Sequence, residues 1–302
     1  MISLTKLSQK RKSPKRYSAL TVANTLRYEY ISCWNREDKI RYASLFSGRY
    51  AGGVKRDMNL YLAESGGLLE AYIPEKLFDG ANILQSFYYA DDFTSKVIIP
   101  NCKRFMLDSG AYSFMAGKKS VNWNEYVEKY CQFIRANNVQ HYFELDIDGI
   151  VGLEQVLEIR KTLEQKTGVK PIPVWHRSRG YDRFLKDAES FPYIAIGGIV
   201  TKEITQKDYP IFSKFIKDAH DRNAKIHGLG FTNLKGITQY HFDSVDSTAW
   251  VSGNRFGAIY RFDGTTMKKI SKPEGCRVKS SKTAINNFLE WKKFAQYAEK
   301  KL

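Results

Sequence analysis

The sequence predicts an α/β protein whose main body is a (β/α)8 barrel of the TIM type. Three observations predict it: short apolar runs recur from residue 58 onward, turns rich in Gly, Asp and Ser follow them, and several intervening segments have helical periodicity. Alternating strands and helices are typical of a parallel sheet, and eight such units favour closure into a barrel. An open, doubly wound sheet is the alternative, but no G-x-G-x-x-G follows the first run.

The strands and helices of the barrel follow from these runs and spacers. Apolar residues at helical spacing predict helices over 124–137, 153–165 and 209–222. A terminal helix is predicted within 280–302, where an apolar stripe follows Ser281 as N-cap. The eight predicted strands are MNLYLAE (58–64), NILQSFYY (82–89), KRFMLDS (103–109), HYFELDI (141–147), KPIPVWH (170–176), YIAIGG (193–198), KIHGLG (225–230) and HFDSVDS (241–247).

Composition divides the chain into three parts. A basic N-terminal extension is predicted over 1–56, with one or two helices in 17–46 and a Gly-rich break at 47–53. The barrel is predicted over 57–264, and a basic helical tail over 265–302.

Positive charge is concentrated at the two ends of the 302-residue chain, whose net charge is +16. Residues 1–56 hold 13 Lys and Arg against 3 Asp and Glu, and residues 265–302 hold 10 against 3. Basic ends on a nearly neutral body fit a polyanion such as nucleic acid, although they can also serve solubility alone. Aromatic residues interleaved with the N-terminal charges favour nucleic acid, because rings stack on bases, although they can equally anchor an N-terminal helical layer. The candidate phosphate contacts there are Lys10, Arg11, Lys12, Lys15 and Arg16.

Composition also excludes several protein classes. No apolar run of about 18 residues is present, so no membrane span is expected. The N-terminal stretch KLSQKRKSPKR is polar and basic, and a cytoplasmic protein is expected. The 4 cysteines lie far apart without a CxxC pair, which predicts reduced thiols and no disulfide framework or cysteine zinc site.

Carboxylates end two of the predicted strands and suggest one active site. FMLDSGAYS (105–113) ends its strand on Asp108, and FDSVDSTAW (242–250) delivers Asp243 and Asp246 into a turn. In a TIM barrel the carboxyl ends of all strands meet at one mouth, although each Asp could instead cap the following helix. The other strand ends contribute Asp146 with Asp148, His176, Gly197 with Gly198, and His227 to Gly230.

In order and spacing, these segments resemble the tRNA-guanine transglycosylase superfamily over roughly residues 58–262. That family has a barrel with an Asp-Ser-Gly-Gly motif, a base-binding Asp, a Gly-Gly loop and a nucleophilic Asp on the last strand. The corresponding segments here are DSGAYS, ELDID, AIGGIV and FDSVDSTAW. PVWH, HGLGFT and VDSTAW look most like the phage and bacterial branch that modifies DNA, the 7-deazaguanine DNA transglycosylases.

The resemblance implies a role for each of these residues. Asp246 is expected to attack C1′ of the target nucleoside, as carboxylates do in retaining glycosidases. Asp243 is the competing candidate for this role, or it instead binds the sugar of the substrate or serves structure. Asp108 is expected to protonate the leaving base and deprotonate the incoming one. Asp146 is expected to read guanine by accepting from N1–H and N2–H₂. The further substrate contacts implied are Ser109, Tyr112 as a stacking ring, His176, Gly197 and Gly198 through backbone N–H groups, and Asn254 and Arg255 on a phosphate.

Structural alternatives stay open for several of these residues. The Gly197–Gly198 pair can serve tight backbone packing, and Asp148 can cap the next helix. His227 can be a core histidine, and Tyr112 can be a core side chain.

Two departures from the family shape the expected substrate. The tRNA enzymes carry a zinc site of three Cys and a His after the barrel, whereas here only Cys276 follows it and no His follows His241, so no such site is expected. Ala111 replaces the second Gly of Asp-Ser-Gly-Gly. Both departures favour DNA over tRNA, and the basic ends would clamp its backbone.

The resemblance therefore implies exchange of guanine in double-stranded DNA, with the target base flipped, for a free 7-deazaguanine such as 7-cyano-7-deazaguanine. No cofactor, ATP or metal is expected, and a homodimer is left open. The alternatives are a tRNA-guanine transglycosylase without the zinc module, an inactive barrel-derived nucleic-acid-binding protein, and an unrelated barrel enzyme that binds phosphate. Dependence on Asp246 separates the transglycosylases from the other two.

Overall fold

The computed structural model describes residues 57–64, 67–116, 121–251, 257–271 and 279–302. The predicted N-terminal extension, 1–56, lies outside these residues.

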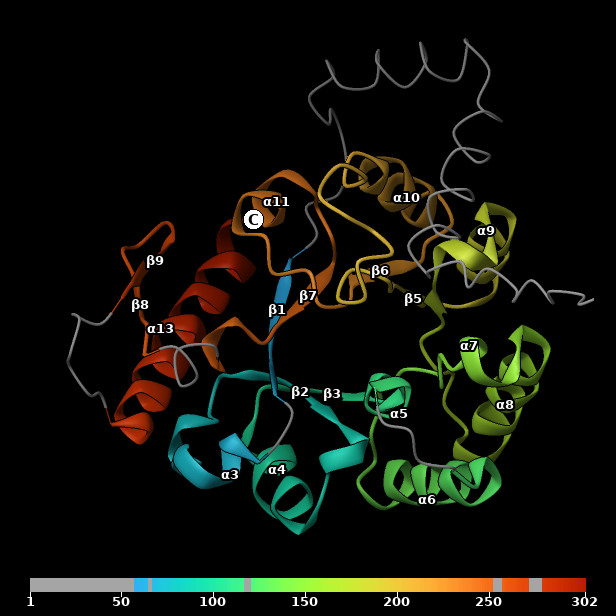
Figure 1. Cartoon of the computed structure of the whole chain (residues 1–302), viewed down its shortest axis with the longest axis horizontal. Helices are drawn as coiled ribbons and strands as arrows, with labels where there is room; N and C mark the ends of the chain where they lie inside the picture. Colours follow the sequence, from blue (N-terminus) through green and yellow to red (C-terminus); the bar gives the residue numbers. More distant parts are fainter. Residues whose placement is uncertain (1–56, 65–66, 117–120, 252–256, 272–278) are drawn as a thin grey trace, which may run out of the picture. The chain divides into compact units, whose positions relative to one another are not determined.

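Seven parallel strands form one curled sheet in the order β3-β2-β1-β7-β6-β5-β4, with helices around it (Figure 1). The predicted α/β class with a parallel sheet is confirmed, because every pair of neighbouring strands in this seven-stranded sheet is parallel. The strands are β1 (Asn59–Glu64), β2 (Asn82–Ser86), β3 (Arg104–Asp108), β4 (Val174–Trp175), β5 (Tyr193–Ile196), β6 (Lys225–Gly228) and β7 (Ser244–Ser247).

The curl of the sheet brings its two edges toward each other. Alternate side chains along a strand share one face, and those of the inner face meet in a single buried cluster. The cluster includes residues of β3 and β4, the two edge strands, which a flat sheet would hold far apart. Its members are Tyr61, Ala63, Leu84, Met106, Phe143, Ile172, Val174 and Ala195.

The predicted strand at 141–147 lies between the two edges of the sheet. Tyr142 forms a parallel bridge with Leu107 of β3, and Phe143 forms one with Ile172, just before β4. The N–H of Phe143 donates to the carbonyl of Leu107 (3.0 Å), and the N–H of Ile172 donates to that of Tyr142 (2.8 Å). This short segment is therefore hydrogen-bonded on both sides.

Helices follow most of the strands, and the four helices predicted by periodicity are confirmed as α6, α8, α10 and α13. Their amphipathic faces cover the sheet, as apolar stripes at helical spacing require. The helices are α3 (Leu68–Tyr72), α4 (Ile99–Asn101), α5 (Ala111–Ala116), α6 (Trp123–Ala136), α7 (Asp148–Val151), α8 (Leu153–Thr167), α9 (Tyr181–Ser190), α10 (Ile211–His220), α11 (Leu234–Gln239) and α13 (Ser280–Lys301), with short 3-10 turns η2 (Glu75–Leu77), η3 (Phe87–Tyr89) and η5 (Arg177–Arg179) and a π turn η4 (Thr94–Ile98).

A small hairpin precedes the C-terminal helix, and the sequence reading did not anticipate it. Strands β8 (Ile259–Phe262) and β9 (Met267–Ile270) are antiparallel, so the predicted boundary at residue 264 falls within their turn. The hairpin is tied to α13 because the Asn287 side chain accepts from the N–H of Tyr260 (2.8 Å) and donates to the carbonyl of Ala258 (3.2 Å). Within the described part of the chain, no helix combines the length and hydropathy needed to cross a membrane.

Candidate active site at the carboxyl ends of the strands

Asp108, Asp146 and Asp246 converge at the carboxyl ends of the strands. Asp108 is the last residue of β3, Asp246 lies near the end of β7, and Asp146 follows the bridged segment. Asp146 and Asp246 are buried, with only 8% and 5% of their surface exposed. Burial, followed by the negative charge of Asp146, raises the pKa of Asp108 to about 7, and Asp246 adds to this rise. The three predicted carboxylates therefore share one electrostatic environment.

The turn after Asp108 fixes this carboxylate. The N–H of Gly110 donates to Asp108 Oδ2 (3.2 Å) and lowers the pKa, but less than burial raises it. Gly110 has φ 80°, and a Cβ there would stand 2.9 Å from the Cβ of Tyr88, so only glycine fits. Ser109, from the same turn, donates to Asp146 Oδ1 (3.5 Å). The DSG segment thus joins two of the predicted site residues.

Asp146 is paired with His176, and His176 in turn is paired with Glu203. The Nε2 of His176 lies 3.0 Å from Asp146 Oδ2, and its Nδ1 lies 3.2 Å from Glu203 Oε2. Burial alone would lower the pKa of His176, but the hydrogen bonds and charges of the two carboxylates outweigh it and raise the pKa to about 10. His176 is therefore an imidazolium at neutral pH, and both its N–H groups donate to carboxylates.

The Gly197–Gly198 pair packs against this carboxylate–imidazolium group. A Cβ on Gly197 would stand 2.7 Å from Cε1 of His176, and one on Gly198, at φ 80°, would stand 2.9 Å from Glu203 Oε2. The N–H of Gly197 donates to the carbonyl of Trp175 (2.8 Å), within the sheet. Close approach to His176 and Glu203 is therefore a sufficient reason for both glycines.

Asp246, within β7, and Asp243, the residue just before β7, point to opposite faces of the sheet. They are three residues apart, so the strand's period of two separates them. Asp246 accepts from the N–H of Gly230 (2.5 Å) and lies 3.2 Å from His227 Nε2, at the carboxyl ends. Asp243 accepts from His220 Nε2 (2.8 Å), on α10, at the amino end of β7. The geometry brings Asp246 to the other site residues and leaves Asp243 on the side of the sheet that the helices cover.

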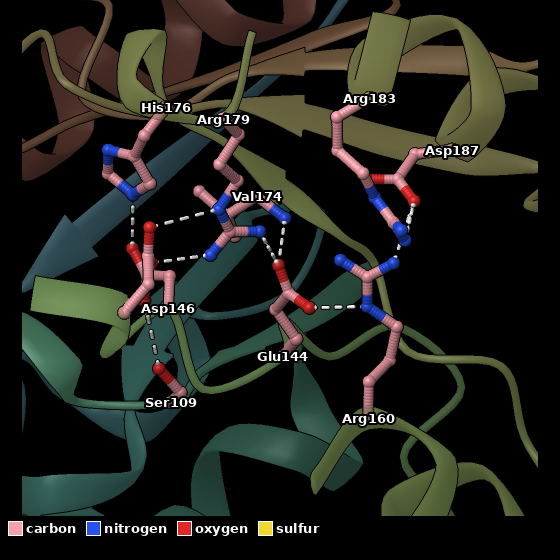
Figure 2. Close-up of polar contacts among 10 residues, drawn as sticks. Ser109, Glu144, Asp146, Arg160, Val174, His176, Arg179, Arg183 and Asp187 are labelled. Atoms are coloured by element: carbon pink, nitrogen blue, oxygen red, sulfur yellow. Dashed lines mark hydrogen bonds and ion pairs between the residues drawn. The ribbon is translucent and has the colours of Figure 1, made fainter. Parts of the chain in front are cut away.

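A buried network of charges supports the segment that carries Asp146. Glu144, fully buried, accepts from Arg179 Nη1 (2.5 Å) and Arg160 Nε (2.5 Å), as Figure 2 shows beside Asp146. Arg179 also binds both carboxylate oxygens of Asp148, at 2.6 and 3.2 Å. Buried charges of this kind are stable only when each has a partner. Residues 144–148 are thus anchored on both sides of Asp146.

The other predicted site residues are exposed or lie outside the described chain. Tyr112, at the start of α5, is 54% exposed, so it is not a core side chain. Asn254 and Arg255 and the N-terminal Lys10, Arg11, Lys12, Lys15 and Arg16 lie outside the described residues. Among the residues that are described, no cluster of His, Cys, Asp or Glu is arranged to hold a metal ion.

The sequence predictions missed two residues of the site, Glu144 and Glu203. They left a third, His227, undecided between a site residue and a core histidine. Glu203 lies in the loop after the Gly197–Gly198 turn, away from a strand end, so no strand pattern predicts that it belongs to the site. His227 alternates with Ile226 on β6, and that alternation was a usable signal that it faces the inner cluster rather than the helices.

No family model matches this chain, and no curated protein matches its sequence. The resemblance drawn from the motifs therefore remains a prediction.

Proposed function

We propose that this protein is a DNA-guanine transglycosylase, which exchanges guanine in DNA for a 7-deazaguanine base through a covalent Asp246–deoxyribosyl intermediate. The observation that carries the proposal is Asp108, a carboxyl group with a pKa of about 7 held near two other aspartates at strand ends. A general acid that must later act as a base works best when its pKa is close to the ambient pH. The convergence of these residues at one end of a parallel sheet supports the same proposal.

The fold proposed for this activity is a closed (β/α)8 barrel. The segment at Tyr142–Phe143 would be its eighth strand, because its bridges reach both edges of the seven-stranded sheet. The single inner cluster of alternate side chains is the packed interior that such a barrel requires. The strand ends would then form a closed ring around the reacting sugar.

In the first half of the proposed reaction, Asp246 attacks C1′ of the target deoxyguanosine. The C1′–N9 bond breaks, its electron pair goes to N9, and Asp108 supplies the proton that the leaving guanine needs. The transition state has oxocarbenium character, so the negative charge of Asp246 stabilises it before the ester bond is complete. This step needs Asp108 in its neutral form, which a pKa of about 7 provides for about half of the molecules at pH 7.

In the second half, the incoming base replaces the enzyme on the same carbon. Asp108, now ionised, takes the N9 proton of the free 7-deazaguanine, N9 bonds to C1′, and the bond to Asp246 breaks. One glycosidic bond is exchanged for another, so the proposed reaction needs no ATP.

The carboxylate of Asp146 is proposed to recognise the base. Its pairing with the imidazolium of His176 and its bond from Ser109 hold it in a fixed orientation. An ionised carboxylate can accept from two donors, as the N1–H and N2–H₂ edge of guanine and of 7-deazaguanines offers. Adenine lacks this pair of donors, so the same contact discriminates against it.

DNA is proposed as the polymer because of the positive charge and of three segments of the sequence. The net charge of +16 favours a polyanion, and PVWH, HGLGFT and VDSTAW look most like the branch of the resembled superfamily that modifies DNA. The target base would be flipped out of the duplex to reach the buried carboxylates.

The direct test is transfer of labelled 7-cyano-7-deazaguanine into duplex DNA, single-stranded DNA or total tRNA. We expect label in duplex DNA, with none for Asp246→Asn and retained transfer for Asp243→Asn, its matched control just before β7 and on the opposite face of the sheet. Label in tRNA alone would instead support the tRNA enzyme. Tight DNA binding without label in any polymer would refute catalysis by this protein.

A further inference from the structure

The two oxygens of the Asp246 carboxylate have different surroundings. Oδ1 accepts from the N–H of Gly230 (2.5 Å) and lies 3.2 Å from Nε2 of His227. Among the described residues, Oδ2 has no hydrogen-bond partner. One oxygen is thus held in place by two donors, and the other is available to a substrate.

His227 is the end of a buried chain of hydrogen bonds that leads away from the site. It is fully buried, and its Nδ1 lies 2.5 Å from Ser244 Oγ, which is also hydrogen-bonded to the hydroxyl of Tyr193. Burial raises the pKa of Tyr193 well above its ordinary value, so this hydroxyl keeps its proton.

When His227 is neutral and Asp246 is ionised, only one arrangement of protons gives each of these hydrogen bonds both a donor and an acceptor. An ionised carboxylate cannot donate, so His227 Nε2 carries the proton and donates to Asp246. Nδ1 then accepts from the Ser244 hydroxyl, whose oxygen accepts from Tyr193. Each group therefore donates a hydrogen bond to the next one, from Tyr193 through Ser244 and His227 to Asp246.

We propose that His227 is a positioning residue that acts through Asp246: with the Gly230 N–H, it anchors Oδ1 so that Oδ2 is the nucleophile and the carboxylate is a good leaving group. The inference rests on the proposed transglycosylase function. In the first half-reaction the Oδ2–C1′ bond forms and Oδ1 becomes the carbonyl oxygen of the ester. In the second, that bond breaks and its electron pair returns to a carboxylate whose charge is shared with Oδ1.

The two half-reactions depend differently on this anchor. Donors to Oδ1 stabilise negative charge on the carboxylate, which assists its departure but makes it less nucleophilic. Loss of the His227 donor should therefore slow the second half more than the first. A hydrogen bond to a charged group corresponds to a rate effect on the order of 10-fold or more.

The test measures both half-reactions in single turnovers, as guanine release from a duplex and as uptake of labelled 7-cyano-7-deazaguanine by the preformed intermediate. His227→Leu should slow uptake at least about 10-fold more than release, so the intermediate accumulates. His227→Gln, whose amide can donate from a similar distance, should restore much of the ratio. The control His220→Leu removes a partly buried His–Asp contact, to Asp243 just before the amino end of β7, and should leave the ratio unchanged.

A second measurement is independent of activity. Nitrogen NMR of histidine-labelled protein should show a proton of His227 on Nε2, with Nδ1 acting as acceptor. A proton on Nδ1, or equal slowing of both half-reactions in His227→Leu, would overturn the inference. Wild-type protein that transfers no base would refute the proposed function instead, and the NMR result would then decide alone whether the anchor exists.

Discussion

Replacing Asp108 with Asn should stabilise the protein at pH 8 and abolish base exchange. Burial, and next the charge of Asp146, raise the pKa of Asp108 from 3.8 to about 7. Between these two values the folded protein holds a proton that the unfolded chain has lost. The wild-type free energy of unfolding should therefore fall as the pH rises from about 4 through about 7, and Asn removes this loss because it has no charge.

The size of the effect follows from the two pKa values. They differ by about 3, and each unit corresponds to about 1.4 kcal/mol, so the wild-type penalty at pH 8 is at most about 4 kcal/mol. At pH 5, which is still below the folded pKa of about 7, the wild-type protein has lost only part of this free energy of unfolding. The stability advantage of Asp108→Asn should thus grow by roughly 2 to 3 kcal/mol between pH 5 and pH 8.

Urea unfolding at pH 5 and pH 8 measures this difference, and Asp148→Asn is the matched control. Burial raises the pKa of Asp148, but its bidentate bond with Arg179 outweighs burial and holds the pKa below its ordinary value. Asp148→Asn should therefore be destabilised to the same extent at both pH values. An Asp108→Asn variant that loses stability equally at both would refute the assignment of Asp108 as a carboxyl with a raised pKa.

Three further predictions concern the surroundings of Asp146. Glu203→Gln should bring the pKa of His176 from about 10 toward neutrality, so the imidazolium is lost at lower pH than in wild type; an NMR titration of His176 checks this. Gly197→Ala should displace His176, raise KM for the free base and cost roughly 1–3 kcal/mol in urea unfolding, because its Cβ would stand 2.7 Å from Cε1. Arg179→Met should destabilise the fold by about 3–5 kcal/mol, since Glu144 loses a buried partner; unchanged stability would contradict the role given to the network.

The sequence predicted the positions of the strands of the sheet, but it did not predict the β8–β9 hairpin. Apolar runs mark buried strands wherever they lie, so all eight predicted runs coincide with a strand or a bridged segment. The β8–β9 hairpin was missed because its strands are short and partly exposed, without the apolar run that marks a barrel strand. Its sequence, IYRF and MKKI around a DGTT turn, alternates only weakly.

At the site, strand-end position predicted the carboxylates but not their partners. Asp108 and Asp146 could be predicted because each ends an apolar run, and the parity of Asp243 and Asp246 on one strand already implied opposite faces. Glu203 could not be predicted, since it reaches His176 from a loop whose path depends on tertiary packing. The bond between His227 and Asp246 depends on the register of β6 and β7, which no single strand specifies.

The most direct test of the central proposal is to locate the covalent intermediate. Protein mixed with guanine-containing duplex DNA, without free base, is denatured rapidly, digested and analysed by mass spectrometry. The proposal predicts a deoxyribosyl adduct on the peptide that spans 242–250, attached at Asp246, together with one released guanine per adduct. An adduct at Asp243 or Asp108, or base exchange that proceeds without any adduct, would contradict it.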